Sequence, residues 1–284
     1  MRNKVEGTLL IIGGAEDKTG KCEILSRFVK LSGAGSSIII IITTAAEEPD
    51  RVGQEYRRIF NKLGAGHIEV LNIDSRRRAN HSYMGRLLEK ATGIFFTGGD
   101  QLRITSVLGG TVTNEGLRSA YLRGTVIAGT SAGASVMSST MIVEGDSDHA
   151  PNLNSIKLAP GLGLLEEVVI DQHFAQRGRI GRLLSAVAHN PYILGMGIDE
   201  DTAVLVHPDA RLEVIGSQTV TFLDGRQIIF TNISELSPDQ ALAIENIVLH
   251  IIPRGFGFDL AARRPIPRSA GRIETEEGEK NEDS

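Results

Sequence analysis

A serine set between two glycines gives the first chemical lead in this sequence. Residues 129–133 read Gly-Thr-Ser-Ala-Gly, directly after the apolar run Thr125–Ala128 and before a segment that can begin a helix. Small residues on both sides of a serine permit a sharp strand-to-helix turn, which exposes the hydroxyl and aims the first helical N–H groups at the bond it attacks. The pattern predicts that Ser131 is a nucleophile and that the N–H of Ala132 stabilises an oxyanion. The competing interpretation is a glycine-rich turn in which Ser131 only caps the helix.

A serine nucleophile needs a base and a third group that orients the base. Among the seven histidines, His173 has the most informative position, because an apolar run at 168–170 ends just before Asp-Gln-His-Phe at 171–174. Catalytic groups gather at strand ends in α/β folds. The acid is expected after the apolar run 193–198, where position alone does not choose among Asp199, Glu200 and Asp201. The order serine, histidine, acid differs from that of α/β-hydrolases and disfavours a plain esterase or lipase.

Other kinds of site have little support in the sequence. The histidines are scattered, Cys22 is the single cysteine and no H-E-x-x-H occurs, so neither a metal nor another cofactor is expected. Two strands end in Gly-Gly followed by an acid, at 13–17 and 98–101. These loops lack the spacing of a dinucleotide fingerprint or a P-loop, so a nucleotide-binding module is only a weak alternative.

Short apolar runs alternate with amphipathic segments over the first half of the chain, which predicts an α/β fold with a doubly wound, mostly parallel sheet and helices on both faces. After about Asp199 the apolar runs are short and separated by turn residues, which predicts antiparallel hairpins. The expected early strands are 8–12, 36–43, 68–73, 93–96 and 125–128, the helices are 22–31, 50–63, 82–91 and 114–122, and the later strands are 203–206, 212–216, 219–223, 227–230 and 247–252.

The charge of this 284-residue chain is unevenly distributed. Of the net −5, residues 272–284 carry −4 and the rest only −1, so nothing suggests nucleic-acid binding. We expect one α/β domain over 1–264 and a disordered acidic tail over 265–284. No apolar run is long enough to span a membrane, the start lacks the apolar core of a secretory signal, and the lone cysteine fits a reducing compartment, so a cytoplasmic location is expected.

Several motifs in order resemble the cyanophycinase family: Gly-Thr-Ser-Ala-Gly, Asp-Gln-His-Phe, an arginine run at 177–182 and Gly-Ile-Asp-Glu at 197–200. The resemblance extends from Gly13-Gly14 to the segment 253–258, which is nearly the whole chain except the acidic tail. It implies a dimeric, cytoplasmic serine exopeptidase with a fold similar to class I glutamine amidotransferases. The implied substrate is cyanophycin, a poly-aspartate whose side chains carry arginine through isopeptide bonds, and the implied product is the β-aspartyl-arginine dipeptide.

Carried over residue by residue, the resemblance implies a nucleophile at Ser131, a base at His173 and an acid at Glu200. We expect Gly99, at the second glycine-rich strand end, to join Ala132 as an oxyanion donor. The arginines would clamp substrate carboxylates, and Asp171 would meet a substrate guanidinium, with Asp17 and Glu48 as further candidates. The substrate-binding residues implied by the resemblance are Gln101, Asp171, Gln172, Arg177, Arg179 and Arg182.

Two related activities compete with this interpretation. An aspartyl dipeptidase that cleaves free N-terminal aspartyl dipeptides would share the serine motif, but the arginine run and Asp-Gln-His-Phe favour the polymer enzyme. A glutamine-amidotransferase-like enzyme would need a cysteine nucleophile, and position 131 is a serine.

Overall fold

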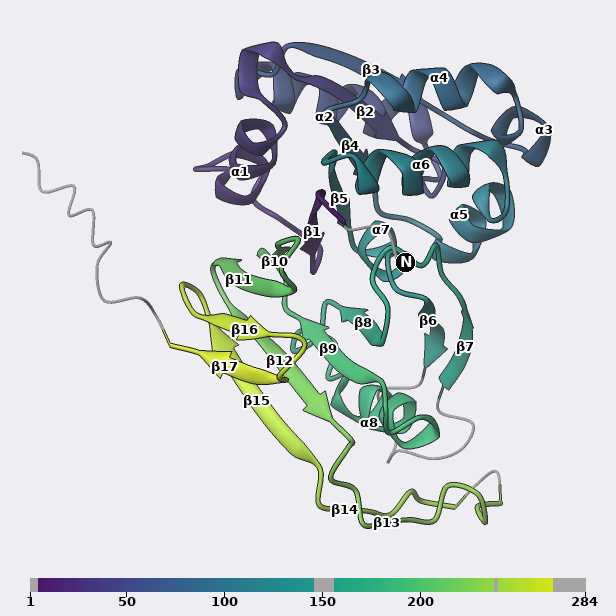
Figure 1. Cartoon of the computed structure of the whole chain (residues 1–284), viewed down its shortest axis with the longest axis vertical. Coiled ribbons are helices and arrows are strands. Elements are labelled where there is room, and N and C mark those ends of the chain that lie inside the picture. Colours follow the sequence, from purple (N-terminus) through teal and green to yellow (C-terminus); the bar gives the residue numbers. More distant parts are fainter. Residues whose placement is uncertain (1–4, 146–155, 238–239, 268–284) are drawn as a thin grey trace, which may run out of the picture.

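The computed structural model describes residues 5–145, 156–237 and 240–267. Its main sheet has nine strands in the order β17-β16-β11-β10-β1-β5-β4-β2-β3 (Figure 1). Strand β1 is parallel to its neighbour β5 and antiparallel to its other neighbour β10, so it divides a parallel half from an antiparallel half. The parallel half contains β1 (Thr8–Ile12), β5 (Val126–Thr130), β4 (Gly93–Phe96), β2 (Ile38–Ile42) and β3 (His67–Leu71); the antiparallel half contains β10 (Thr202–Val206), β11 (Arg211–Gly216), β16 (Gly257–Asp259) and β17 (Arg264–Ile266).

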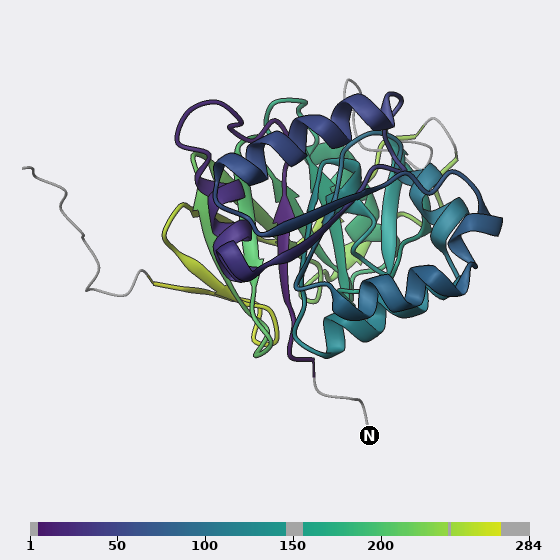
Figure 2. The ribbon, with the colours of Figure 1, turned by 90° about the horizontal axis from the view of Figure 1, so that it is seen from above.

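Helices cover both faces of the parallel half (Figure 2). On one face, Phe28 of α1 and Phe60 of α2 pack against Phe95 of β4, with ring centroids 5.2 to 5.5 Å apart. On the other face, Leu88 of α4 and Leu117 of α6 are fully buried against the opposite side chains of the same strands. The α/β fold class predicted from the sequence is confirmed. The helices of this region are α1 (Glu23–Leu31), η1 (Ala34–Ser36), α2 (Pro49–Lys62), α3 (Arg76–Ala79), α4 (Ser82–Lys90), α5 (Gln101–Leu108), α6 (Val112–Leu122) and α7 (Ala132–Ser135).

A second sheet of four strands, in the order β15-β12-β9-β8, packs on the face that also carries α4 and α6. Met196 of β9 and Phe222 of β12 share one core with Phe96 of β4. The runs at 168–170 and 193–198 therefore form the parallel pair β8 and β9 in this second sheet and do not extend the first. Helix α8 packs on its outer face through Leu183 and Val187. The elements are β8 (Val168–Gln172), α8 (Ile180–His189), β9 (Leu194–Ile198), β12 (Thr219–Asp224) and β15 (Val248–Pro253).

Some expected boundaries differ from the structure. The strand expected at 227–230 is wrong, because the Asp224 carboxylate accepts a bond from the Arg226 N–H and the Ile228 N–H bonds to Gly225, which makes a turn there. Only β13 (Phe230–Thr231) follows, paired with β14 (Ile244–Glu245). A further pair joins β6 (Thr140–Gly145) and β7 (Ile156–Pro160). Strand β17 crosses the boundary expected between 264 and 265, and residues 268–284 of the acidic tail lie outside the described residues.

Within the described ranges, no helix has both the length and the apolar character needed to cross a bilayer.

Candidate active site

The turn between β5 and α7 holds Ser131 in an unusual backbone conformation. Its φ is 53° and its ψ is −114°, a combination that side-chain-bearing residues rarely adopt outside strained functional turns. The flanking glycines make this geometry possible. A Cβ at Gly129 would lie 2.3 Å from the Gly133 carbonyl oxygen, and one at Gly133 would lie 2.6 Å from the Phe96 carbonyl oxygen. The turn therefore requires glycine at both positions, as the sequence pattern suggested.

Ser131, His173 and Glu200 form a hydrogen-bonded line. The Ser131 Oγ lies 3.0 Å from His173 Nε2, and His173 Nδ1 lies 2.6 Å from Glu200 Oε1. With the Nδ1 proton directed at the carboxylate, Nε2 is left as an acceptor for the serine proton. His173 and Glu200 follow the paired strands β8 and β9, which explains why residues 27 positions apart meet. The hydroxyl, the imidazole and the carboxylate thus have the arrangement of a serine triad.

The structure also distinguishes the three adjacent acids at 199–201. Asp199 is buried and accepts bonds from the Ala175 N–H at 3.0 Å and the Thr219 hydroxyl at 2.8 Å. Asp201 accepts a bond from the Asp17 N–H at 2.9 Å. Both flanking carboxylates therefore hold loops together, and Glu200 is the one that reaches the imidazole.

The end of β1 ties these segments together through its backbone. The Ser131 N–H donates to the Ile12 carbonyl at 3.1 Å, the His173 N–H to the Gly13 carbonyl at 2.8 Å and the Asp201 N–H to the Gly14 carbonyl at 2.9 Å. Gly14 has a φ of 104°, and a Cβ there would lie 2.3 Å from the His173 Cε1. The imidazole therefore lies directly against the glycine backbone, which leaves it little freedom to move.

The two expected oxyanion donors lie in segments next to the serine. Ala132 is the first residue of α7, and Gly99 follows Gly98, where an added Cβ would lie 3.9 Å from the Ser131 Oγ. Neither the Ala132 N–H nor the Gly99 N–H donates a hydrogen bond to another described residue. Gly99 has a φ of 138°, and a Cβ there would lie 2.0 Å from the Ala45 carbonyl oxygen, so the loop depends on glycine. Both amides lack a partner among the described residues, as an oxyanion donor must, and their role stays a prediction.

Burial lowers the pKa of His173 from its ordinary value of 6.5. The hydrogen bond to Glu200 opposes this shift, while the positive charges of Arg177 and Arg179 add to it. The imidazole therefore stays neutral to lower pH than a free histidine does. A neutral ring is the form that can accept a proton from Ser131.

Asp171 is buried among charged side chains of the protein. It is 1% exposed, and its carboxylate accepts bonds from Arg182 Nε at 2.6 Å and from Arg182 Nη2, with Arg179 Nη1 at 3.3 Å. Two guanidinium groups of the protein therefore occupy the Asp171 carboxylate, and its expected contact with a substrate guanidinium stays a prediction. A buried carboxylate requires such partners.

Arg179 and Arg182 are buried too, since they pack beside Asp171 where α8 begins. Arg179 Nη1 also donates to the Gln172 carbonyl and to Gln172 Oε1 at 2.9 Å, whereas its buried Nε has no hydrogen-bond partner among the described residues. Burial lowers the pKa of Arg179 to about 10, although Asp171 opposes the shift. Of the three arginines only Arg177 is exposed.

The remaining expected ligands are partly occupied by the protein itself. Gln101 Nε2 donates to the carbonyls of Ile142 and Val143 at 3.2 and 2.9 Å, which attaches α5 to β6. The Asp17 carboxylate accepts backbone bonds from three residues of its own loop, which lower its pKa, and Glu48 pairs with Arg51. Asp17 is therefore turned into its own loop, away from the role considered for it.

A buried acid next to the serine was not foreseen as part of the site. Glu16 is 4% exposed and accepts a bond from the Thr130 hydroxyl at 2.6 Å and another from the Tyr56 hydroxyl. Burial, together with the charge of Glu16, raises the pKa of Tyr56. Because Thr130 directly precedes Ser131, the hydrogen bonds to Glu16 restrain the turn that holds the serine. The Gly-Gly-acid pattern at the end of β1 was the one available signal for Glu16.

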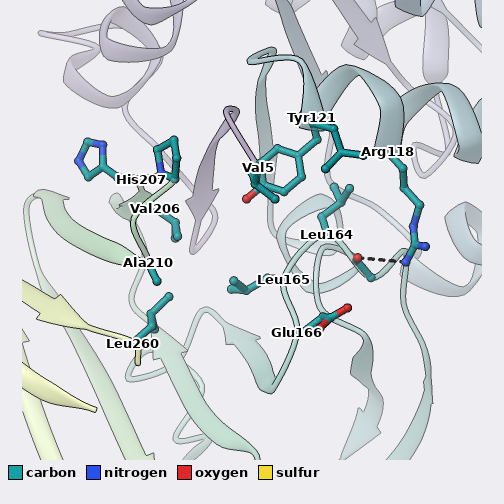
Figure 3. Close-up of a pocket in the computed structure, with 13 residues that line it drawn as sticks. Val5, Arg118, Tyr121, Leu164, Leu165, Glu166, Val206, His207, Ala210 and Leu260 are labelled. Carbon is teal, nitrogen blue, oxygen red and sulfur yellow. Dashed lines mark hydrogen bonds between the residues drawn. The ribbon is translucent and has the colours of Figure 1, made fainter. Parts of the chain in front are cut away.

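Two cavities lie near β1, at its opposite ends. A cavity of about 340 Å³ includes Ser131 and Glu16 in its lining. A cavity of about 510 Å³ lies at the other end of β1, between Val5 and Tyr121 on one side and the turn at His207 on the other (Figure 3). Its lining contains none of the residues expected to act on substrate. Among the described residues no group of histidine, cysteine and acidic side chains is arranged to hold a metal ion.

A hydroxyl, imidazole and carboxylate in line at the strand ends of an α/β fold define a serine hydrolase. Residues 9–214 match the model of peptidase family S51, and the chain belongs to this family.

Several relatives are similar over most of their length. The chain is 41% identical to a cyanophycinase of Geminocystis herdmanii over 275 residues, covering 96% of this chain and all of that protein. It is 43% identical to a cyanophycinase of Trichormus variabilis over 260 residues, covering 91% of this chain and 87% of the relative. Among solved structures, a peptidase from an acI-B1 Actinobacterium gives a TM-score of 0.61 at 23% identity, covering 87% of this chain and 98% of that one. This last likeness supports the fold.

Replacing Gly14 with alanine tests whether the β1 backbone positions the imidazole. We expect Gly14→Ala to slow labelling of Ser131 by a fluorophosphonate at least about 100-fold, because the new methyl group displaces the ring and small displacements of reacting groups are costly. Gly64→Ala is the matched control, since Gly64 also has a positive φ, of 83°, but nothing lies within 4 Å of its added Cβ. Equal labelling rates in the two variants would contradict this role of Gly14.

The pH dependence of labelling tests the environment of His173. The rate should fall as pH drops through the pKa of His173, with a midpoint below 6.5, because only the neutral ring accepts the serine proton. Arg177→Met removes a positive charge that lowers this pKa, so the midpoint should move to higher pH. Arg211→Met, at an exposed arginine of β11, should leave the midpoint unchanged. A midpoint that does not respond to Arg177→Met would refute the electrostatic coupling.

Proposed function

We propose that this chain is a cyanophycinase, a serine exopeptidase that hydrolyses the poly-aspartate backbone of cyanophycin and releases β-aspartyl-arginine dipeptides. The observation that carries the proposal is the line from Ser131 through His173 to Glu200, in a chain 40–43% identical to proteins named cyanophycinase over most of its length. The substrate is inferred from the relatives, and the reaction type is inferred from the geometry of the triad.

In the proposed reaction Ser131 Oγ attacks the aspartyl carbonyl carbon while His173 Nε2 takes the hydroxyl proton. Glu200 keeps the imidazole in the reactive tautomer and stabilises it when it becomes positively charged. The oxyanion accepts bonds from the N–H groups of Ala132 and Gly99, and one such donor contributes about 3 kcal/mol to transition-state stabilisation. The carbon–nitrogen bond then breaks as His173 protonates the leaving amine. Water, deprotonated by His173, hydrolyses the serine ester and restores the hydroxyl.

An exposed cation near the triad suits a substrate whose branches carry a carboxylate. Arg177 is the exposed cation beside the imidazole and supplies a partner for a branch carboxylate. Arg179, Arg182, Asp171 and Gln172 form the buried wall behind it. Together with Gln101, these residues are proposed to shape the substrate site.

The remaining expectations are part of the same proposal. The peptidase domain comprises residues 1–264 and acts as a homodimer in the cytoplasm without a cofactor, and the acidic tail from 265 onward is an appendage. Its substrate is the polymer, and no nucleic acid or membrane takes part in the reaction.

The decisive assay follows dipeptide release from insoluble cyanophycin by mass spectrometry. We expect Ser131→Ala and His173→Ala each to lower the rate by about 10⁴- to 10⁶-fold, because members of a triad act as a unit. Both variants should fold, as judged by circular dichroism and thermal unfolding. The wild-type chain should prefer the polymer to free N-terminal aspartyl dipeptides, and the opposite preference would indicate the aspartyl dipeptidase alternative. Equal release by wild type and Ser131→Ala would refute the triad.

A further inference from the structure

The 340 Å³ cavity shares the serine with the triad but is built from different elements. Ser131, Thr130 and Gly98 lie at its inner end, and the rest of its lining comes from the loop after β1 and from α2. None of its lining residues is His173, Glu200 or one of the three arginines at 177–182. The residues that line it are Ala15, Glu16, Lys18, Arg51, Val52, Glu55, Tyr56, Gly98, Thr130 and Ser131.

The cavity carries fixed charges of both signs. Lys18 Nζ lies 3.3 Å from Glu55 Oε1 and 4.5 Å from the centre of the Tyr56 ring. Arg51 and Glu55 are four residues apart on α2, so both project from one face of the helix. The Lys18 and Glu55 side chains are 31% and 39% exposed, and that of Arg51 is 67% exposed. Ion pairs this exposed are weak, so a charged ligand can exchange partners with them at little cost.

The inner end of the cavity is rigid by comparison. Glu16 is held by the hydroxyls of Thr130 and Tyr56, and Tyr56 is packed against Phe95 with ring centroids 4.6 Å apart. Val52 supplies apolar surface to the cavity, whereas the Tyr56 ring is 3% exposed and lies beneath Lys18. The cavity therefore has a rigid inner end, a small apolar surface and charged side chains at its opening.

We propose that this cavity is a second substrate subsite, which binds the β-aspartyl-arginine unit across the scissile bond from the unit that reaches Arg177. The inference rests on the proposed function. An enzyme that cuts between two identical units must accommodate a charged branch on each side of Ser131, and Arg177, the exposed arginine of the 177–182 run, serves one side. In this subsite Lys18 and Arg51 bind the carboxylate of the branch arginine, Glu55 binds its guanidinium, and Val52 packs against its methylene groups.

The test uses soluble three-unit oligomers of β-aspartyl-arginine in which one arginine carboxylate is amidated, either in the terminal unit or in the unit next to it. Amidation removes one charge and leaves the backbone unchanged. For wild type we expect each modification to lower kcat/KM for dipeptide release about tenfold, the effect of losing one charge-assisted hydrogen bond. In Lys18→Met and in Arg51→Met, one of the two modifications should lose most of its effect, and the other should keep it.

Matched controls separate this result from general damage. Arg58→Met removes an exposed charge from α2 outside the cavity and should behave as wild type toward all three oligomers. Glu55→Gln should reduce discrimination between arginine and citrulline in the same unit, which tests the subsite independently if Lys18→Met unfolds at a lower temperature. Wild-type discrimination at both units in Lys18→Met, Arg51→Met and Glu55→Gln would overturn the subsite while leaving the proposed function intact. No dipeptide from the unmodified oligomer with wild type would instead overturn the proposed function.

Discussion

Three consecutive carbonyl groups at the end of β1 form the constraint on which the rest of the site depends. Ile12, Gly13 and Gly14 accept the backbone N–H groups of Ser131, His173 and Asp201 in turn. One strand end thus holds the turn with the hydroxyl, the loop with the imidazole and the loop with the carboxylate. Because the three loops come from two different sheets, their relative position would otherwise depend on how accurately those sheets pack.

The three residues whose N–H groups donate to these carbonyls have unfavourable backbone conformations. The φ values of Ser131, His173 and Asp201 are 53°, 50° and 47°, and each such residue costs about 1–3 kcal/mol. Hydrogen bonds to β1 hold all three loops, and the close packing at Gly14 also restrains the His173 ring. The cores on both faces of the main sheet, buried at Phe28 and Phe96, supply the stability that makes this strain tolerable. Because these contacts hold the strained residues in place, the groups are oriented before any substrate arrives.

A structural feature could be predicted from the sequence when the residues that determine it lie close together in the chain. The turn at Ser131 could be predicted because all the residues that it requires lie within five adjacent positions. For His173, the sequence showed only that a histidine follows an apolar strand. Glu200 could not be distinguished from Asp199 and Asp201 without the family resemblance, because the direction of each carboxylate depends on tertiary contacts. The division into two sheets was hidden for the same reason. Apolar runs that are buried on both faces look alike whichever sheet they join.

The arginines show that a sequence pattern alone does not determine whether a charged side chain faces a ligand or pairs inside the protein. A run of cations after a strand fits ligand binding and internal pairing equally well, and here Arg182 and Arg179 surround Asp171. Two guanidinium groups against one carboxylate leave excess positive charge, and Arg177 and Arg179 lower the pKa of His173. Under the proposed function, a substrate carboxylate bound at Arg177 would weaken this field. Substrate binding would then raise the basicity of the imidazole, so that His173 becomes a stronger base when the scissile bond is in place.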